Sequence, residues 1–370
     1  MSAFRPPPYP YDRLEDLRAL AAASPGGMVD LSVGTPHDPP SPAVVAALAT
    51  SGAERGYPAG AGTPELRRAA AGWMARTFGV DVDADHIAAC VGTKELVAGL
   101  PALLRLARPE RDTVLHPAVA YPTYAMGATL AGCRAVGVAL DDRWRLDLAG
   151  VDAADAARAL CLWVNTPGNP AGGLDDLGAV AAWGRAHGVP VLSDECYAQL
   201  TWEGEPRTVL AGGSEGVLAV HSLSKRSNLA GLRCGFYAGD PDLVAHLREL
   251  RRHAGLMVPG PVQAAAVVAL GDDDHAGAQR ARYRRRLELL AGALREAGLD
   301  AGLPGGGLYL WVPAPGGDAW ALAERLARQA GIVGAPGDLY GPAGAGHLRL
   351  AVVAPTPRLA EAAARLAPSV

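Results

Sequence analysis

The sequence predicts an α/β fold, with a large domain built on a mainly parallel seven-stranded sheet and a smaller α+β domain at the C-terminal end. Short, continuous apolar runs alternate with amphipathic helical patterns over the first two thirds of the chain, which is typical of a parallel sheet covered on both faces. After about residue 255 a long charged helix precedes isolated strands and helices. The chain has 370 residues, 49% of them hydrophobic, and is therefore long enough to divide into two lobes.

The N-terminal residues are expected to form an arm and one segment of the smaller domain. A helix is predicted over residues 11–23 and a short strand over 28–33, which Gly34, Thr35 and Pro36 end. The predicted division of the chain is an arm with a small-domain segment at 1–40, a large domain at 41–255 and a small domain at 256–370.

The remaining elements follow the same patterns. Helices are predicted after Pro42 and over residues 65–77. Seven apolar runs are expected as the strands of the large sheet, at 87–91, 113–116, 135–140, 159–164, 189–193, 217–221 and 235–238. Helices are expected among these strands at 94–107, 122–132 and 174–187. The small domain is expected to hold a helix at 275–298, strands at 307–312 and 348–353, and helices at 319–330 and 357–366.

The net charge and the cysteine pattern argue against several classes of function. A net charge of −4 and a pI near 6.1 give no basic field for nucleic acid or an anionic membrane, and five arginines between residues 280 and 286 are expected on a solvated helix face. Five scattered cysteines without a C-x-x-C, and nine histidines without ligand spacing, predict neither a metal site nor a disulfide framework. Since no signal pattern and no apolar run of roughly 18 residues occurs, a cytoplasmic protein without a membrane segment is expected.

One stretch carries the strongest chemical signal. Ser222 and Ser224 precede Lys225, and Arg233 follows eight residues later between two glycines. A lysine amine can form a Schiff base with an aldehyde, while the hydroxyls and the guanidinium suit a phosphate. Pyridoxal 5′-phosphate carries both groups. A solvated loop that follows a strand is the alternative interpretation.

Polar residues at other strand ends fit the same cofactor. Thr93 and Lys94 open a helix whose free N–H groups suit a phosphate, although Thr93 is also an ordinary N-cap. Asp194 can pair with a protonated pyridine nitrogen, and Tyr197 with the phenolic oxygen of the ring. An aspartate at a strand end can also serve only as a helix cap.

Three further residues are candidates for binding a flat cofactor or a carboxylate. Asn169 precedes a proline, which holds it extended, although turn chemistry explains this pair equally well. Tyr121 could lay its ring on the cofactor. Arg349 lies in an apolar strand and needs an anion, either a substrate carboxylate or an internal acidic partner. No G-x-G-x-x-G opens the first strand–helix unit, which disfavours a nicotinamide dehydrogenase.

In order and spacing, these motifs resemble the fold-type I, pyridoxal-phosphate-dependent aminotransferases of class I and II over nearly the whole chain. The matching set is Gly34, Tyr57, Gly92-Thr93-Lys94, Tyr121, Asn169-Pro170, Asp194, Tyr197, Ser222, Ser224, Lys225, Arg233 and Arg349. Within that family the chain most resembles the actinobacterial N-succinyl-LL-diaminopimelate aminotransferases, for example in the stretches 29–36, 221–231 and 336–341.

The resemblance implies the role of each matching residue. Lys225 would hold the cofactor covalently and move a proton between the substrate's Cα and the cofactor. Asp194 would pair with the pyridine nitrogen, Tyr197 and Asn169 would pair with the ring oxygen, and Tyr121 would stack on the ring. The phosphate would be held by Thr93, Lys94, Ser222, Ser224 and Arg233, joined by Tyr57 from the other subunit of a homodimer. The α-carboxylate would be held by Gly34, Asn169 and Arg349.

The implied activity is amino-group exchange between glutamate or 2-oxoglutarate and N-succinyl-2-amino-6-oxopimelate, in lysine biosynthesis through diaminopimelate. Lys94 and Arg226 are candidates for a second carboxylate of that substrate. Alternatives are an aminotransferase of aspartate, aromatic or secondary-metabolite specificity and a carbon–sulfur lyase on the same fold. A non-catalytic pyridoxal-phosphate-binding regulator is disfavoured, since only about 30 residues precede the first strand.

Overall fold

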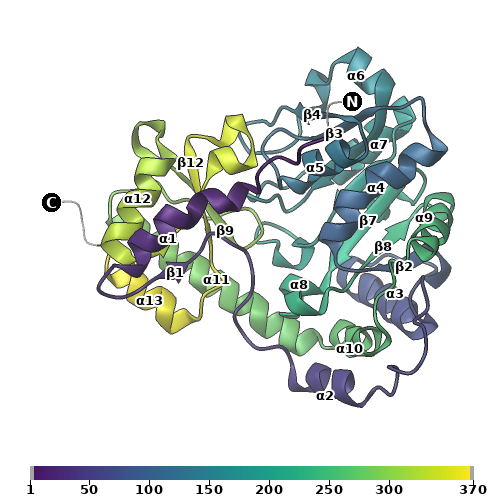
Figure 1. Cartoon of the computed structure of the whole chain (residues 1–370), viewed down its shortest axis with the longest axis horizontal. Helices are drawn as coiled ribbons and strands as arrows, with labels where there is room; N and C mark the ends of the chain where they lie inside the picture. The colour runs from purple at the N-terminus through teal and green to yellow at the C-terminus, as the bar shows by residue number, and fades with distance from the viewer. Residues whose placement is uncertain (1–3, 367–370) are drawn as a thin grey trace.

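A computed structural model describes residues 4–366, which fold into a larger and a smaller part side by side (Figure 1). The larger part is built on a seven-stranded sheet in the order β2-β8-β7-β6-β5-β3-β4. Its strands are β2 (Ile87–Cys90), β3 (Thr113–Pro117), β4 (Arg134–Val138), β5 (Ala159–Asn165), β6 (Val191–Asp194), β7 (Val217–Ser222) and β8 (Gly235–Gly239). Strand β8 is antiparallel to both of its neighbours, whereas β3 to β7 pair in parallel.

Helices cover both faces of this sheet, which explains why its central strands are apolar on both sides. Helices α4 (Thr93–Ala107), α5 (Thr123–Leu130) and α9 (Pro241–His253) share one apolar core with the sheet. Helices α2 (Pro42–Thr50), α3 (Pro64–Phe78), α7 (Leu177–His187) and α10 (Gly260–Gly271) share the core on the opposite face. The short helix α6 (Ala153–Arg158) leads into β5.

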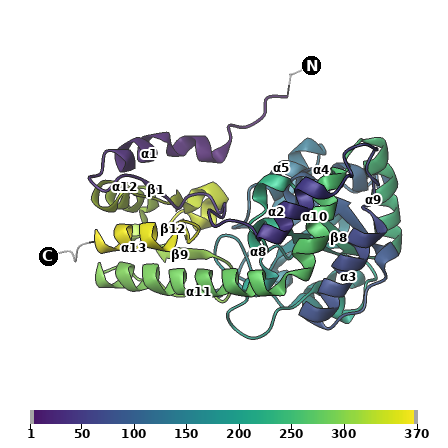
Figure 2. The ribbon, with the colours of Figure 1, turned by 90° about the horizontal axis from the view of Figure 1, so that it is seen from below.

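The smaller part packs around a third apolar core. It contains the antiparallel sheet β11-β12-β9 and the parallel pair β1-β10. These strands are β1 (Val29–Asp30), β9 (Tyr309–Pro313), β10 (Ile332–Val333), β11 (Ala335–Pro336) and β12 (His347–Ala351). The helices are α1 (Glu15–Ala22), α11 (Asp273–Glu296), α12 (Ala319–Ala330) and α13 (Thr356–Ala364). Figure 2 shows α11 extending from the region of α8 (Leu223–Arg226) to a position alongside β9 and α13.

The predicted fold class is confirmed, with differences at the level of single elements. The strand expected at 28–33 is only two residues long, and helices α6, α9 and α10 were not predicted. Helix α10 follows the predicted boundary at residue 255 yet packs on α2 and α3, and the domain limits stay a prediction.

The prediction of a solvated arginine face is wrong for Arg286. This residue is 2% exposed, and its guanidinium donates to both carboxylate oxygens of Asp38, at 2.7 and 2.8 Å. Helical periodicity turns Arg286 inward, where the segment after Gly34 supplies the acidic partner that a buried charge requires.

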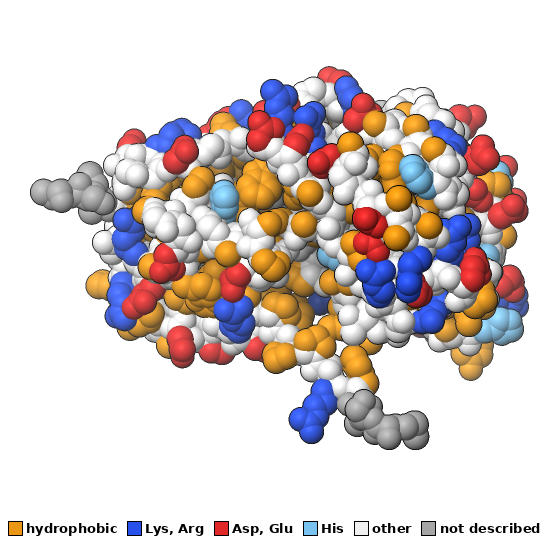
Figure 3. All heavy atoms as spheres, turned by 90° about the horizontal axis from the view of Figure 1, so that it is seen from above, with side chains coloured by type: hydrophobic (Ala, Val, Ile, Leu, Met, Phe, Trp, Pro, Cys, Tyr) orange, Lys and Arg blue, Asp and Glu red, His pale blue; other side chains and the backbone are white. Residues whose placement is uncertain are grey.

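Positive and negative side chains are interspersed over the face seen in Figure 3. Within residues 4–366, every helix is too short or too polar to cross a membrane.

Candidate active site

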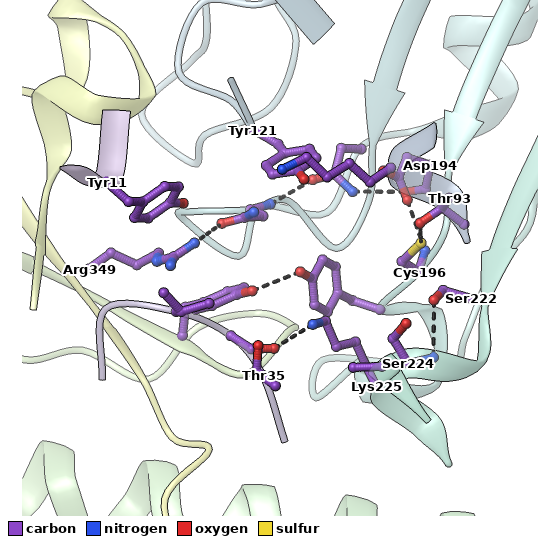
Figure 4. A pocket seen from close by; sticks show the side chains of 18 of the residues that line it. Tyr11, Thr35, Thr93, Tyr121, Asp194, Cys196, Ser222, Ser224, Lys225 and Arg349 are labelled. Carbon is purple, nitrogen blue, oxygen red and sulfur yellow. Dashed lines mark hydrogen bonds between the residues drawn. The ribbon is translucent and has the colours of Figure 1, made fainter. Parts of the chain in front are cut away.

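A cavity of about 510 Å³ lies where the large sheet meets the smaller part (Figure 4). Its floor comes from the carboxyl ends of β5, β6 and β7 and from the start of α4, which is where ligands bind in open parallel sheets. The segment around Gly34 and residue Arg349 of β12 close it from the smaller part.

This cavity brings together all of the predicted site residues except Tyr57 and Arg226. The lining includes Gly34, Thr93, Lys94, Tyr121, Asn169, Asp194, Tyr197, Ser222, Ser224, Lys225, Arg233 and Arg349. Tyr57 lies elsewhere, with its side chain 99% exposed. The whole chain has two lysines, Lys94 and Lys225, and both line this one cavity.

Lys225 lies in the single turn of α8 that follows β7. Its Nζ donates a hydrogen bond to the carbonyl oxygen of Gly34, which reaches in from the N-terminal segment. Burial lowers the pKa of the amine to about 8, and the cations of Arg349 and Arg233 act in the same direction. The fold therefore supplies an amine whose neutral fraction near physiological pH is far larger than that of an exposed lysine, although the protonated form still predominates below a pKa of about 8.

One end of the cavity is rich in groups that bind anions. The free N–H groups at the start of α4 face a set of hydroxyls and a guanidinium, from Thr93, Ser222, Ser224 and Arg233. Gly92 has φ 73°, and a Cβ there would clash with the Arg233 guanidinium. The backbone of Arg233 is itself left-handed, with φ 54°, and its Nη1 donates to the carbonyl of Ala230 at 2.8 Å.

A buried carboxylate lies close to Thr93 on the floor (Figure 4), and Cys196 contacts both residues. Asp194 is 6% exposed and accepts hydrogen bonds from the Tyr124 hydroxyl at 2.8 Å and the Cys196 N–H at 3.2 Å. Burial raises the pKa of Asp194 above its ordinary value. A cation beside this carboxylate would lower its pKa again and stabilise the charged form.

Two tyrosines meet between Asp194 and the smaller part. The hydroxyl oxygens of Tyr197 and Tyr309 are 2.7 Å apart, and both side chains are buried. Burial, with Tyr309 as neighbour, raises the pKa of Tyr197 well above its ordinary value, so both phenols carry their protons.

Arg349 presents a fixed guanidinium to the cavity. It is 2% exposed, and it donates to Asn169 Oδ1 at 2.8 Å and to the carbonyl of Ser32. The ring centroids of Tyr309 and Tyr340 lie 4.2 and 4.7 Å from its Cζ. The predicted need for an anion is consistent with this geometry, since neither neighbour is acidic and the site suits an incoming carboxylate.

Several site residues escaped the sequence reasoning. Tyr9, Tyr11, Tyr124 and Tyr309 all line the cavity or contact its polar groups, and isolated tyrosines carry no motif that distinguishes them from packing residues. Lys94 Nζ donates to the Tyr9 hydroxyl at 3.2 Å and lies 4.8 Å from that ring's centroid.

The expectation that Arg226 binds a second substrate carboxylate is wrong. Arg226 does not line this cavity; its side chain turns to the other side of α8, where it donates to Gln199 at 2.6 Å and pairs with Asp273 at 3.3 Å. The guanidinium of Arg226 instead lies against α10 and α11, where it donates to the carbonyl of Ala269 and its charge is already paired with Asp273.

The residues present fit pyridoxal 5′-phosphate. A hydroxyl and guanidinium cradle at a helix start suits its phosphate, and a lysine amine of lowered pKa suits its aldehyde. A buried carboxylate without a cationic hydrogen-bond partner among the described residues suits its pyridine nitrogen. Among residues 4–366, His, Cys, Asp and Glu side chains form no cluster of three that could hold a metal ion.

Comparisons with known proteins agree with this arrangement. The model of the family "Aminotransferase class I and II" matches residues 26–366. A probable aminotransferase of Mycobacterium tuberculosis is 47% identical over 97% of this chain and 85% of its own length. A 4-dedimethylamino-4-oxo-anhydrotetracycline transaminase of Streptomyces rimosus is 43% identical over 97% and 99%. The structure of a probable N-succinyldiaminopimelate aminotransferase from Thermus thermophilus superposes with a TM-score of 0.86 and 32% identity, over 96% of this chain and 99% of that one.

Proposed function

Because the chain belongs to the class I and II aminotransferases, which depend on pyridoxal 5′-phosphate, we propose that it exchanges an amino group between glutamate and N-succinyl-2-amino-6-oxopimelate. The products are 2-oxoglutarate and N-succinyl-LL-2,6-diaminopimelate, and the reaction belongs to lysine biosynthesis. The family acts on amino acids and oxo acids. The finer assignment draws support from the likeness to the Thermus thermophilus protein.

The observation that carries the proposal is the position of Lys225 in one cavity with Asp194 and Arg349. Arg349 binds the α-carboxylate, with Asn169 fixing its guanidinium. The Lys225 amine, in its neutral form, would take the proton from the substrate's Cα and deliver it to the cofactor within the same half-reaction, and the second half-reaction would run this transfer in reverse. Bound pyridoxal 5′-phosphate supplies the electron sink that makes that proton acidic.

Lys94 supports the proposal that the substrate carries a second anionic group. Its ammonium lines the cavity, is exposed, and has no carboxylate within 4.0 Å among the described residues. Such a cation can bind the succinyl or distal carboxylate while it also attracts the cofactor's phosphate.

The proposed assembly is a homodimer with shared active sites. Tyr57 matches a family position that reaches the cofactor's phosphate, yet its side chain is 99% exposed in the single chain. A second copy of the chain would give this hydroxyl its partner.

An amino-group-transfer screen tests the proposal. Purified holoenzyme with glutamate and N-succinyl-2-amino-6-oxopimelate should form 2-oxoglutarate faster than with oxaloacetate, phenylpyruvate or pyruvate as acceptor. Lys225→Ala should lower the rate about a thousandfold and abolish the visible absorbance of the bound cofactor. Release of pyruvate and ammonia without an acceptor would instead indicate a carbon–sulfur lyase.

A second candidate is amination of a bulky cyclic ketone. The likeness to the Streptomyces rimosus transaminase, at 43% identity over nearly both full lengths, favours it. The two candidates differ at Arg349, because a ketone without a carboxylate gains nothing from its guanidinium. Arg349→Met should therefore abolish amination of N-succinyl-2-amino-6-oxopimelate, but it should leave the half-reaction with such a ketone largely intact.

A further inference from the structure

Tyr309 touches three of the groups on which the proposed function depends. It lies in β9, is 3% exposed, and places its hydroxyl 2.7 Å from that of Tyr197. Its ring lies under the Arg349 guanidinium, 4.2 Å from Cζ to the centroid. Its hydroxyl also fills the space beside Gly34, where an added Cβ would clash with it.

The contact between the two hydroxyls allows two arrangements, which differ in which phenol donates. Each phenol has one hydrogen, so only one of the two can donate across the 2.7 Å contact. Within the described residues, neither hydroxyl has another hydrogen-bond partner. If Tyr197 donated to Tyr309, it would have no hydrogen left for an acceptor in the cavity. If Tyr309 donates, the Tyr197 hydrogen is free to point into the cavity, and it is also the more strongly polarised of the two.

The ring has a separate effect on Arg349. Tyr309 and Tyr340 lie against the guanidinium at 4.2 and 4.7 Å, and the second ring is itself held by the 3.0 Å contact between the hydroxyls of Tyr340 and Tyr11. The Nε of Arg349 is buried and has no hydrogen-bond partner among residues 4–366. Nη1 and Nη2 donate one hydrogen bond each, to Asn169 and Ser32, so each keeps one hydrogen for an incoming carboxylate.

We propose that Tyr309 is a positioning residue with two separable parts: its hydroxyl donates to Tyr197 and frees the Tyr197 hydrogen for the cofactor's ring oxygen, while its ring orients Arg349 toward the substrate carboxylate. The inference rests on the proposed function, in which Tyr197 binds that ring oxygen and Arg349 binds the carboxylate. One side chain of the smaller part would thus position both Tyr197, which binds the cofactor, and Arg349, which binds the substrate carboxylate.

Other titratable groups face the same space and must stay unchanged in the test. Those around the tyrosine pair are Tyr11, Asp194, Cys196, Lys225, Arg233 and Arg349. Because Tyr309→Phe alters none of them, a change in pH dependence reports on the hydroxyl alone.

The test compares two substitutions in the holoenzyme. The first measurement is the pH midpoint of the bound cofactor's visible absorbance change, which needs no turnover. Tyr309→Phe should raise this midpoint by about half a pH unit, because a weaker Tyr197 donor stabilises negative charge on the ring oxygen less. The second measurement is the dissociation constant of succinate, an unreactive carboxylate. Tyr309→Phe should leave it within about twofold, whereas Tyr309→Leu should raise it about fivefold because Arg349 loses the ring.

Tyr283→Phe is the matched control. This tyrosine is fully buried in α11, and its hydroxyl has no hydrogen-bond partner among the described residues. Neither measurement should change. Should Tyr309→Leu fail to fold, Tyr309→Met replaces it, since methionine fills a similar volume without an aromatic face.

Two results would overturn the proposal: an absorbance midpoint in Tyr309→Phe equal to that of the wild type, or equal succinate constants in the phenylalanine and leucine variants. A wild-type enzyme inactive with N-succinyl-2-amino-6-oxopimelate would contradict the substrate assignment instead. Both measurements on Tyr309 would still be decisive, because neither uses that substrate.

Discussion

At the scale of single residues, Lys225 differs from an exposed lysine chiefly because it is buried beside cations. Burial lowers its pKa from 10.5 to about 8. In cofactor-free protein, carbamylation of this amine by cyanate should therefore rise with pH and level off above a midpoint near 8. Since the chain has only two lysines, the two modified peptides can be followed separately by mass spectrometry. A midpoint near 10.5 would contradict the buried environment.

Asp194 is predicted to cost stability in the cofactor-free protein. Its pKa is raised in the folded state by burial, so the stability that it contributes is fully present below its unfolded pKa of 3.8 and is lost as pH rises through the folded pKa. Asparagine resembles the protonated form throughout. The melting temperature of Asp194→Asn, relative to the wild type, should therefore increase as pH rises from 4 towards 7.

Cofactor binding should reverse the effect of this substitution. A pyridinium beside the carboxylate stabilises its charged form, so the wild-type holoenzyme should be more stable than the Asp194→Asn holoenzyme at pH 7. Melting curves of both proteins, with and without cofactor, give the difference in melting temperature between the variant and the wild type in each state. The same sign in both states would mean that Asp194 does not face the cofactor's nitrogen.

At the scale of elements, the start of α4 depends on a backbone that only glycine adopts easily. Gly92 has φ 73°, and a side chain there would meet the Arg233 guanidinium. Gly79, which caps α3, has φ 68° and no atom within 4 Å of an added Cβ. Gly79 is in the left-handed helical region, where alanine should cost roughly 1–2 kcal/mol. Gly92, with ψ 151°, is in a region that is essentially restricted to glycine, and alanine there should cost up to about 3 kcal/mol.

Only Gly92→Ala should also weaken cofactor binding. Displacement of Arg233 from the phosphate cradle is expected to raise the dissociation constant of pyridoxal 5′-phosphate about tenfold, which corresponds to roughly 1.4 kcal/mol. Denaturant unfolding gives the strain in each variant, and absorbance titration gives the cofactor affinity. Equal affinities in the two variants would show that Arg233 does not depend on the glycine.

The elements that could be predicted from sequence are those with a periodic apolar pattern. Helix α12 was predicted at its observed limits, and all seven strands of the large sheet were placed within a few residues. The direction of β8 was not predictable, because it depends on how Arg233 and its neighbours turn after α8 rather than on the strand's own residues. Strand β1 was overestimated because Leu31 is buried and apolar but no longer pairs as a strand.

The site was predictable only where residue types imply chemistry. A lysine between serines, or an aspartate at a strand end, carries a motif that sequence reasoning can find. Tyr124 and Tyr309 carry none, and their roles arise because α5 and β9 bring them to Asp194 and Tyr197 in space. Arg226 was assigned a role because it lies in the lysine motif, although the motif does not reveal which side of α8 its side chain faces.

At the scale of the whole molecule, the proposed dimer makes a prediction that no single variant can test. If Tyr57 serves the site of the partner subunit, each active site takes Lys225 from one subunit and Tyr57 from the other. Lys225→Ala and Tyr57→Ala therefore remove contributions that come from different subunits. A dimer formed from one subunit of each kind then has one site with Lys225 and Tyr57 both intact. The other site in that dimer lacks both.

Mixing the two inactive variants should therefore restore activity. Random exchange of subunits in an equal mixture makes about half of the dimers mixed. Each mixed dimer has one intact site out of two, so about one quarter of all sites regain the full set of residues. Activity measured after slow exchange should approach this fraction of the wild-type value. Lys225→Ala mixed with Asp194→Asn is the matched control, because both residues line the cavity of the same chain and every site in a mixed dimer keeps one defect. Recovery in both mixtures would point to trace wild-type enzyme, and recovery in neither would mean that each subunit carries a complete site of its own.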